Sequence, residues 1–173
     1  MRGRLSAFAA HLAVTVLALG LVAALTWLLW YPSPYAALQG IGPIFGLLAV
    51  TALVLGPVLT LAVYRKGKKG LAFDLVVIAL LQIGALGYGA WTIHAERPQY
   101  LVFALDRYNV LGARDVDLST LREPALLAPP AQGPRLLVAN MPMGEAFQRL
   151  QHEVLFEGKP DLERRPEFWS GYG

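Results

Sequence analysis

The sequence predicts an integral membrane protein with three transmembrane α-helices, followed by a small α+β carboxy-terminal domain. The chain has 173 residues, of which 55% are hydrophobic and only 16% charged, and this is too apolar for a soluble domain of its size. The apolar residues are concentrated before residue 95, whereas 11 of the 12 acidic residues lie from Glu96 onward. We therefore expect two domains, a membrane domain of residues 1–95 and a polar domain of residues 96–173.

Three apolar segments are long enough to cross a bilayer. They cover about residues 7–31, 41–64 and 71–93. Each exceeds the roughly 20 residues that a spanning helix needs. The first segment could instead be a cleaved signal peptide, but it is too long for one and it ends in Trp27, Trp30 and Tyr31 rather than in small residues. A retained helix is therefore the favoured interpretation.

Basic residues indicate the orientation of the spans. Arg2 and Arg4 precede the first span, and the loop between the second and third spans has four basic residues and no acid, namely Arg65, Lys66, Lys68 and Lys69. The loop after the first span, which begins at Pro32, carries no charge. The positive-inside rule therefore places the amino terminus and the basic loop in the cytoplasm. In a Gram-negative host the spans lie in the inner membrane and the carboxy-terminal domain is periplasmic.

Aromatic residues support this orientation independently of charge. Trp30 and Tyr31 at the end of the first span match Tyr88 and Trp91 near the end of the third. Tryptophan and tyrosine are enriched at membrane interfaces, so these residues are expected to form a belt at the periplasmic surface.

Small residues recur in the second and third spans. The glycines are Gly42, Gly46, Gly56, Gly84, Gly87 and Gly89. Small residues let lipid-embedded helices approach closely, so they favour a tight three-helix bundle; the alternative is a groove that receives another membrane helix. Pro57 lies inside the second span, where it removes a backbone donor and is expected to kink the helix.

Few polar residues lie within the spans. Gln82, near the middle of the third span, is expected to hydrogen-bond to another helix. Asp74, in the first turn of that span beside the basic loop, is expected to be ionised and structural. His11 is interpreted as an interfacial residue rather than as a ligand. The three histidines are scattered and cysteine is absent, so the sequence indicates neither a metal site nor a cofactor.

The polar domain is expected to contain two strands and a helix. Residues 99–110 are rich in β-formers and predict one strand, and residues 135–140 predict a second. A short helical turn at residues 117–121 is expected to be capped by Asp117 or Ser119. Residues 144–156 predict a helix whose apolar face comprises Phe147, Leu150, Val154 and Leu155. The polar tail, residues 161–173, carries Phe168, Trp169 and Tyr172.

Several function classes are disfavoured by the residues alone. The basic residues flank apolar segments and form no stripe with interleaved aromatics, so nucleic acid is not an expected partner. His94, Glu96 and Asp106 are the nearest candidates for chemistry at the outer interface, but they form no recognised catalytic motif. A small membrane enzyme and a subunit of another envelope or transport complex remain open as alternatives.

Several stretches match one family in the same order along the chain. They are residues 8–12 (FAAHL), 30–35 (WYPSPY), 55–61 (LGPVLTL), 73–75 (FDL), 78–82 (IALLQ), 88–89 (YG) and 97–108 (RPQYLVFALDRY). Together they resemble the bacterial type IV pilin accessory protein family, the TfpX/TfpZ-like proteins. The chain departs from this family at Thr51-Ala52, where an acidic residue commonly precedes the Leu-Gly-Pro.

The resemblance implies a non-enzymatic accessory or chaperone protein that acts on a cognate type IV major pilin in the inner membrane, among membrane lipids. On this hypothesis the glycine-rich faces of the second and third spans receive the pilin helix, and residues 97–108 with the aromatic tail contact the pilin head. The candidate partner-binding residues are Gly56, Pro57, Gln82, Gly84, Gly87, Arg97, Phe103, Asp106, Arg107 and Tyr108.

Overall fold

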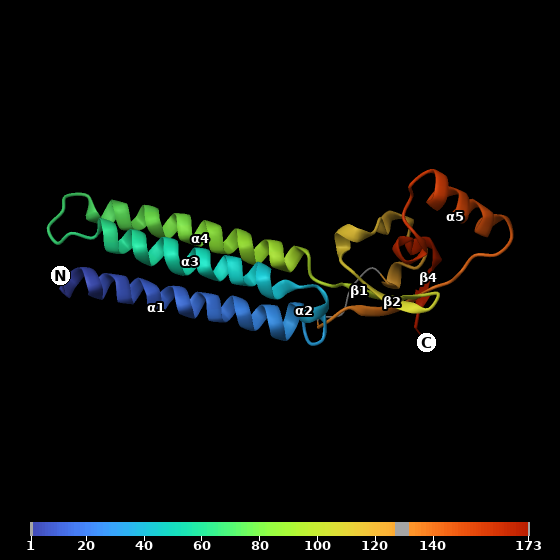
Figure 1. The fold of residues 1–173 in the computed structure, drawn as a ribbon, viewed down its shortest axis with the longest axis horizontal. Coiled ribbons are helices and arrows are strands. Elements are labelled where there is room, and N and C mark those ends of the chain that lie inside the picture. The colour runs from blue at the N-terminus through green and yellow to red at the C-terminus, as the bar shows by residue number, and fades with distance from the viewer. Residues whose placement is uncertain (1, 127–131, 173) are drawn as a thin grey trace. The chain divides into compact units, whose positions relative to one another are not determined.

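The three apolar segments form long helices, because a backbone in hydrocarbon must satisfy its own hydrogen bonds. The computed structural model describes residues 2–126 and 132–172. In it the long helices are α1 (Arg2–Leu25), which continues as a π-helical turn (Thr26–Trp30), α3 (Ile41–Val63) and α4 (Leu71–Ala95) (Figure 1). A single short helix, α2 (Tyr35–Leu38), lies between the first two. All three long helices are long and apolar enough to cross a membrane, so the predicted multi-pass architecture is confirmed.

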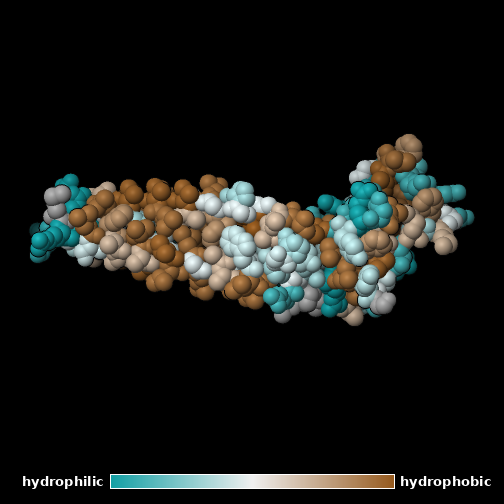
Figure 2. Space-filling view, turned by 60° about the horizontal axis from the view of Figure 1, so that its bottom comes forward, coloured by the Kyte–Doolittle hydropathy of each residue, from teal (hydrophilic) through white to brown (hydrophobic). Residues whose placement is uncertain are grey.

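The chain divides into two compact units. The helical unit comprises the residues up to Leu28 together with residues 36–94, and the sheet unit comprises residues 29–35 and those from Ala95 onward. Much of the surface of the three helices in Figure 2 is hydrophobic, and hydrophilic colour gathers at the end that carries the amino terminus. This pattern is the one expected of helices that face lipid along most of their length.

The amino terminus and the 64–70 loop lie at the same end of the helical unit (Figure 1). The Arg4 guanidinium donates to the carbonyl of Leu61 at 2.8 Å, and so caps the carboxy-terminal end of α3. At the start of α4, Asp74 pairs with Lys68 of the basic loop, as expected for an ionised acid in the first helical turn. Basic side chains thus occupy this end of the unit, both on α1 and in the loop.

In residues 95–126 and 132–172, the sheet unit forms four strands in the order β2-β1-β3-β4. These are β1 (Tyr100–Ala104), β2 (Arg107–Leu111), β3 (Arg135–Ala139) and β4 (Trp169–Gly171). β1 pairs antiparallel with β2 and parallel with β3, and β3 pairs antiparallel with β4. Among the described residues of this unit, the one long helix is α5 (Glu145–Phe156). Short 3₁₀ turns are Ala113–Asp115, Leu118–Thr120, Pro124–Leu126, Leu162–Arg164 and Pro166–Phe168.

The core of the sheet unit lies on one face of the sheet. Tyr100, Val102 and Ala104 alternate along β1 and are buried, as the two-residue period of a strand requires. Leu150 of α5 and Trp169 of β4 pack into the same cluster. α5 and the 3₁₀ turns therefore cover this face, while the alternate residues of each strand lie on the other.

The expectation of one strand over residues 99–110 is wrong, because the chain reverses within it. Ala104 of β1 pairs with Arg107 of β2, so Leu105 and Asp106 form a two-residue hairpin loop. Leu105 adopts φ = 58°, and a positive φ at the first loop position is typical of the turns that match strand twist. The loop lacks the glycine or asparagine that normally signals such a turn, which is why the composition pointed to a continuous strand.

Leu105→Gly is expected to stabilise the sheet unit. A leucine in the left-handed region is strained by about 1–2 kcal/mol, and its side chain is 66% exposed, so little packing is lost with it. The higher backbone entropy of glycine in the unfolded chain offsets part of this gain, leaving a net increase of up to about 1 kcal/mol. Thermal unfolding of the full chain in detergent measures it, and a lower transition temperature for the variant would contradict the argument.

The other elements of this unit follow the sequence in part. The helical turn capped by Asp117, the strand at residues 135–140 and the helix at residues 144–156 are confirmed. Within that helix, however, Leu155 is 71% exposed and does not belong to the buried face. The tail also contains a strand, β4, which the sequence interpretation missed.

Candidate functional site

A cluster of polar side chains joins the three long helices. Gln82 of α4 lies 2.6 Å from His11 Nε2 and donates to the Thr15 hydroxyl at 2.7 Å, both residues being on α1. It also donates to the carbonyl of Ala52 on α3 at 3.3 Å. The Thr60 hydroxyl lies 2.6 Å from His11 Nδ1. The prediction that Gln82 bonds to another helix is confirmed, and His11 is part of this cluster.

The partners of the cluster determine the direction of each hydrogen bond. A carbonyl only accepts, so Gln82 directs its amide NH₂ at Ala52 and its oxygen at His11, whose Nε2 must therefore carry the proton. The Thr60 hydroxyl can then donate to the unprotonated Nδ1. Every polar group is satisfied with a neutral imidazole, which is the arrangement that costs least in hydrocarbon.

An apolar groove opens between α3 and α4 beside this cluster. Its volume is about 300 Å³, and it is lined by Leu48, Thr51, Ala52, Leu55, Gly56, Leu59, Ile78, Leu81, Gln82, Ala85 and Leu86. Leu55 and Leu81 are 54% and 65% exposed, so the groove opens to the surroundings of the helical unit rather than into its interior. The groove is also lined by Thr51 and Ala52. These are the two positions at which the sequence analysis noted the departure from the pilin accessory family.

The glycines of the second and third spans divide into two classes. A Cβ at Gly56 would lie 1.5 Å from Gln82 Oε1, and one at Gly89 would lie 2.6 Å from Leu48, so these two glycines permit close helix packing. A Cβ at Gly84 or Gly87 would meet nothing within 4 Å among the described residues. The tight-bundle interpretation therefore holds for Gly56 and Gly89, while Gly84 and Gly87 leave open surface on α4.

The outward face of the sheet is a second candidate surface. Phe103 and Tyr108 are paired across β1 and β2, with ring centroids 5.0 Å apart, and Tyr108 is 52% exposed. The phenol of Tyr172, just after β4, contacts Tyr108 and raises its pKa. The predicted strand and part of the aromatic tail thus meet on one face. Trp169, by contrast, is buried in the core and does not belong to this face.

Comparison with known proteins places these features in a family. A family model described as fimbrial assembly protein FimB matches residues 1–40, which contain Arg4, His11 and Thr15 of the helical unit. The fimbrial assembly protein of serogroups C1 and C2 of Dichelobacter nodosus is 32% identical over 113 residues, covering 64% of this chain and 86% of that protein. The chain belongs to the fimbrial assembly protein family. The membership expected from the sequence is thereby confirmed.

Two longer relatives from Dichelobacter nodosus match almost the whole chain. The fimbrial assembly protein of serogroup I is 30% identical over 166 residues, or 94% of this chain, and that of serogroup E1 is 32% identical over 161 residues, or 91%. The chain spans 64% and 62% of the lengths of these two proteins, which is less than two thirds. No solved structure matches the chain.

In this member of the family, the remaining candidate residues lie in α3, in the hairpin, and close to the ends of the long helices. Pro57 is buried in α3 next to Gly56. The exposed Asp106 and Arg107 pair with each other at 2.8 Å in the hairpin, and this bond lowers the pKa of Asp106. Arg97 is half-buried between α4 and β1. Trp30 ends the π-helical turn, and the carbonyl of Pro32 accepts a hydrogen bond from the Tyr35 amide.

The structure adds residues that sequence reasoning missed. His11, Thr15 and Thr60 belong to the Gln82 cluster, and no spacing rule singles them out because they come from two different helices. Among the described residues, no group of three histidine, cysteine or acidic side chains could hold a metal ion.

Proposed function

We propose that this protein is a non-enzymatic accessory factor of pilus assembly that binds the transmembrane helix of a cognate type IV major pilin and promotes its stability or its entry into the pilus. The observation that carries the proposal is the groove between α3 and α4, which opens sideways from the helices of a fimbrial assembly family member. A pilin combines an apolar membrane helix with a globular head, so its binding partner needs one surface in the membrane and one outside it.

The chemistry of the groove suits an apolar helix. Its lining is almost entirely aliphatic, and the polar atoms of Gln82 are already satisfied by α1 and α3. Without a hydrophobic driving force in lipid, helices associate through close packing, and a preformed groove beside a small residue such as Ala85 provides it. At about 100° per residue, Gly84 flanks Ala85 on α4, whereas Gly87 lies about 160° away from it.

The basic end of the helical unit supports the orientation that we propose. Arg4 and the Arg65–Lys69 loop lie at one end, which the positive-inside rule assigns to the cytoplasm of a bacterial inner membrane. With three spans, the proposed orientation has the sheet unit in the periplasm. There we propose that the face containing Phe103 and Tyr108 contacts the pilin head, with Arg97, Asp106 and Arg107 at its margins.

Photocrosslinking in the native host tests this proposal. A photoreactive residue is placed in turn at Ala85, in the groove, at Gly84, on its flank, and at Gly87, on the far side of α4. Leu17 on α1, which is 74% exposed, serves as the control for non-specific capture. We expect the major pilin to be captured most from Ala85, to an intermediate extent from Gly84, and several-fold less from Gly87 and Leu17.

Two results would contradict the proposal. Equal capture of pilin from Leu17 and Ala85 would mean that the groove is not the binding surface. Capture from Ala85 of other envelope proteins, with no pilin, would favour a subunit of another envelope complex.

A further inference from the structure

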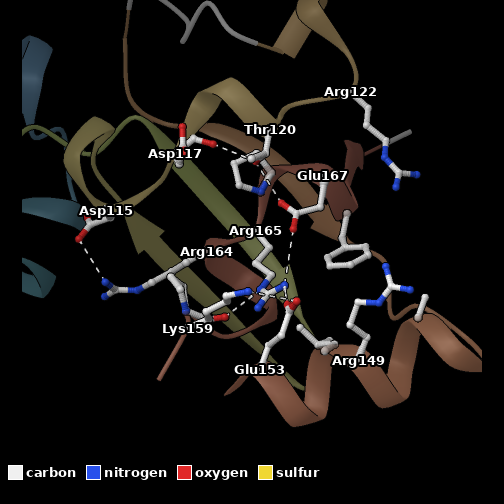
Figure 3. A pocket seen from close by; sticks show the side chains of 15 residues that line it. Asp115, Asp117, Thr120, Arg122, Arg149, Glu153, Lys159, Arg164, Arg165 and Glu167 are labelled. Carbon is white, nitrogen blue, oxygen red and sulfur yellow. Dashed lines mark hydrogen bonds and ion pairs between the residues drawn. The ribbon is translucent and has the colours of Figure 1, made fainter. Parts of the chain in front are cut away.

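A charged pocket lies in the sheet unit, away from the sheet face described above (Figure 3). It has a volume of about 600 Å³, within the range of ligand-binding pockets. Its charged lining residues are Asp115, Asp117, Arg122, Arg149, Glu153, Lys159, Arg164, Arg165 and Glu167. Leu150 and Phe168 contribute apolar wall. The pocket is built by α5 on one side and by the 3₁₀ turns on the other.

The carboxylates of the pocket are largely compensated by its own bases. Glu153 accepts from Arg165 at 2.6 Å and from Lys159 at 3.2 Å, and these bonds lower its pKa. Glu167 lies 3.7 Å from Arg165 and accepts from the Thr120 hydroxyl. In the other part of the pocket, Asp115 pairs with Arg164 and Asp117 accepts from the Ser119 amide. The acids therefore offer little to a cation.

Three arginines keep unused donors. Arg122 and Arg149 have no hydrogen bond or ion pair among the described residues, and no dashed line reaches either guanidinium in Figure 3, where both lie on the same side of the pocket. The Arg165 side chain is only 11% exposed, yet its Nη2 atom has no acceptor among the described residues. Buried donors are almost always paired, so an unpaired guanidinium nitrogen at the pocket wall calls for an acceptor.

We propose that this pocket binds a carboxylate-bearing peptide segment of a protein partner, with Arg122 and Arg149 holding the carboxylate. Planar guanidinium groups match the geometry of a carboxylate and bind it through paired hydrogen bonds. The apolar wall at Leu150 and Phe168 would accommodate the neighbouring aliphatic part of the segment. This inference is independent of the proposed function, because the partner need not be a pilin.

A peptide fits this pocket better than an anionic membrane does. A lipid surface favours a cluster of basic residues without acids, whereas Glu153 and Glu167 lie within the lining here. A peptide supplies donors, acceptors and apolar groups together, so it can face a mixed lining. Lipid binding is therefore treated as a competing outcome of the test.

Binding to the full chain in detergent tests the proposal. The probes are a fluorescent Gly-Glu-Glu-Gly peptide, its Gly-Gln-Gln-Gly counterpart and vesicles containing anionic phosphatidylglycerol. We expect the glutamate peptide to bind about tenfold or more tightly than the glutamine peptide, and the Arg122→Gln, Arg149→Gln double variant to lose that difference. Because neither arginine has a partner among the described residues, thermal unfolding of the variant is expected to match that of the parent.

Arg114→Gln is the matched control, since the Arg114 side chain is 57% exposed and lies outside the pocket. Its removal is expected to leave peptide binding unchanged. The proposal would be overturned if the two peptides bound with equal affinity or if neither bound. It would also be overturned if the double variant kept the difference in affinity between the peptides. Vesicle binding that depends on the two arginines, while peptide binding does not, would overturn it too.

Discussion

Gly56→Leu is expected to destabilise the helical unit by about 2–4 kcal/mol. The new Cβ would stand 1.5 Å from Gln82 Oε1, so Gln82 must move and give up its bonds to His11 and Thr15. Interhelical hydrogen bonds in membranes contribute about 0.6–2 kcal/mol, and overpacking costs about 1–3 kcal/mol. Detergent-denaturation curves of the full chain, followed by circular dichroism, measure the loss.

Gly46→Leu provides the matched control on the same helix. A Cβ there meets nothing within 4 Å among the described residues, so the denaturation midpoint is expected to stay close to that of the parent. If the two variants shifted the midpoint equally, the loss at position 56 would reflect leucine in α3 generally and not contact with Gln82.

Trp169→Ala is expected to unfold the sheet unit in a large fraction of the molecules. Trp169 is 5% exposed, packs against Tyr100 at a ring distance of 5.2 Å and donates to the Glu163 carbonyl. Removing a buried tryptophan costs about 3–5 kcal/mol, whereas roughly 80 residues provide only about 4–12 kcal/mol of stability. Limited trypsin digestion of the full chain in detergent is expected to degrade the sheet unit rapidly while the helical unit persists.

Tyr172→Ala tests whether the effect of Trp169 on protease resistance comes from its burial rather than from its aromatic character. Tyr172 lies three residues further along the tail and is 57% exposed, so its loss is expected to leave protease resistance unchanged. Trp169→Phe should be intermediate, because it keeps a ring beside Tyr100 but loses the hydrogen bond to Glu163. Rapid digestion of the Tyr172 variant would show that the outward face also stabilises the sheet unit.

The helices could be predicted because membrane insertion depends on the length and polarity of a segment, which are read directly from residues 7–93. The sheet unit is harder, because its signals are local and short. Leu105 occupies a position where glycine is usual, so the residues of the loop did not indicate a hairpin. β4 has only three residues, and its register depends on β3, which lies about 30 residues earlier in the chain.

The candidate site, like the fold, could be predicted from the sequence only in part. The polar character of Gln82 inside an apolar helix was enough to predict a partner on another helix, because an unpaired amide in lipid is costly. The identity of that partner required the packing of three helices, which brought His11 and Thr60 to it. Glycine spacing gave no means to separate Gly56, which faces Gln82, from Gly84, which faces outward, since both follow the same small-residue pattern.

The place of β4 in the sheet has a consequence for biosynthesis. A ribosome releases the three long helices first, and these can associate as soon as Ala95 has emerged. β3 keeps one unpaired edge until residues 169–171 arrive, and an exposed edge is a template for pairing with other chains. The helical unit is thus assembled while the sheet is still vulnerable, and a nascent chain stalled before Trp169 would be a natural substrate for quality-control proteases.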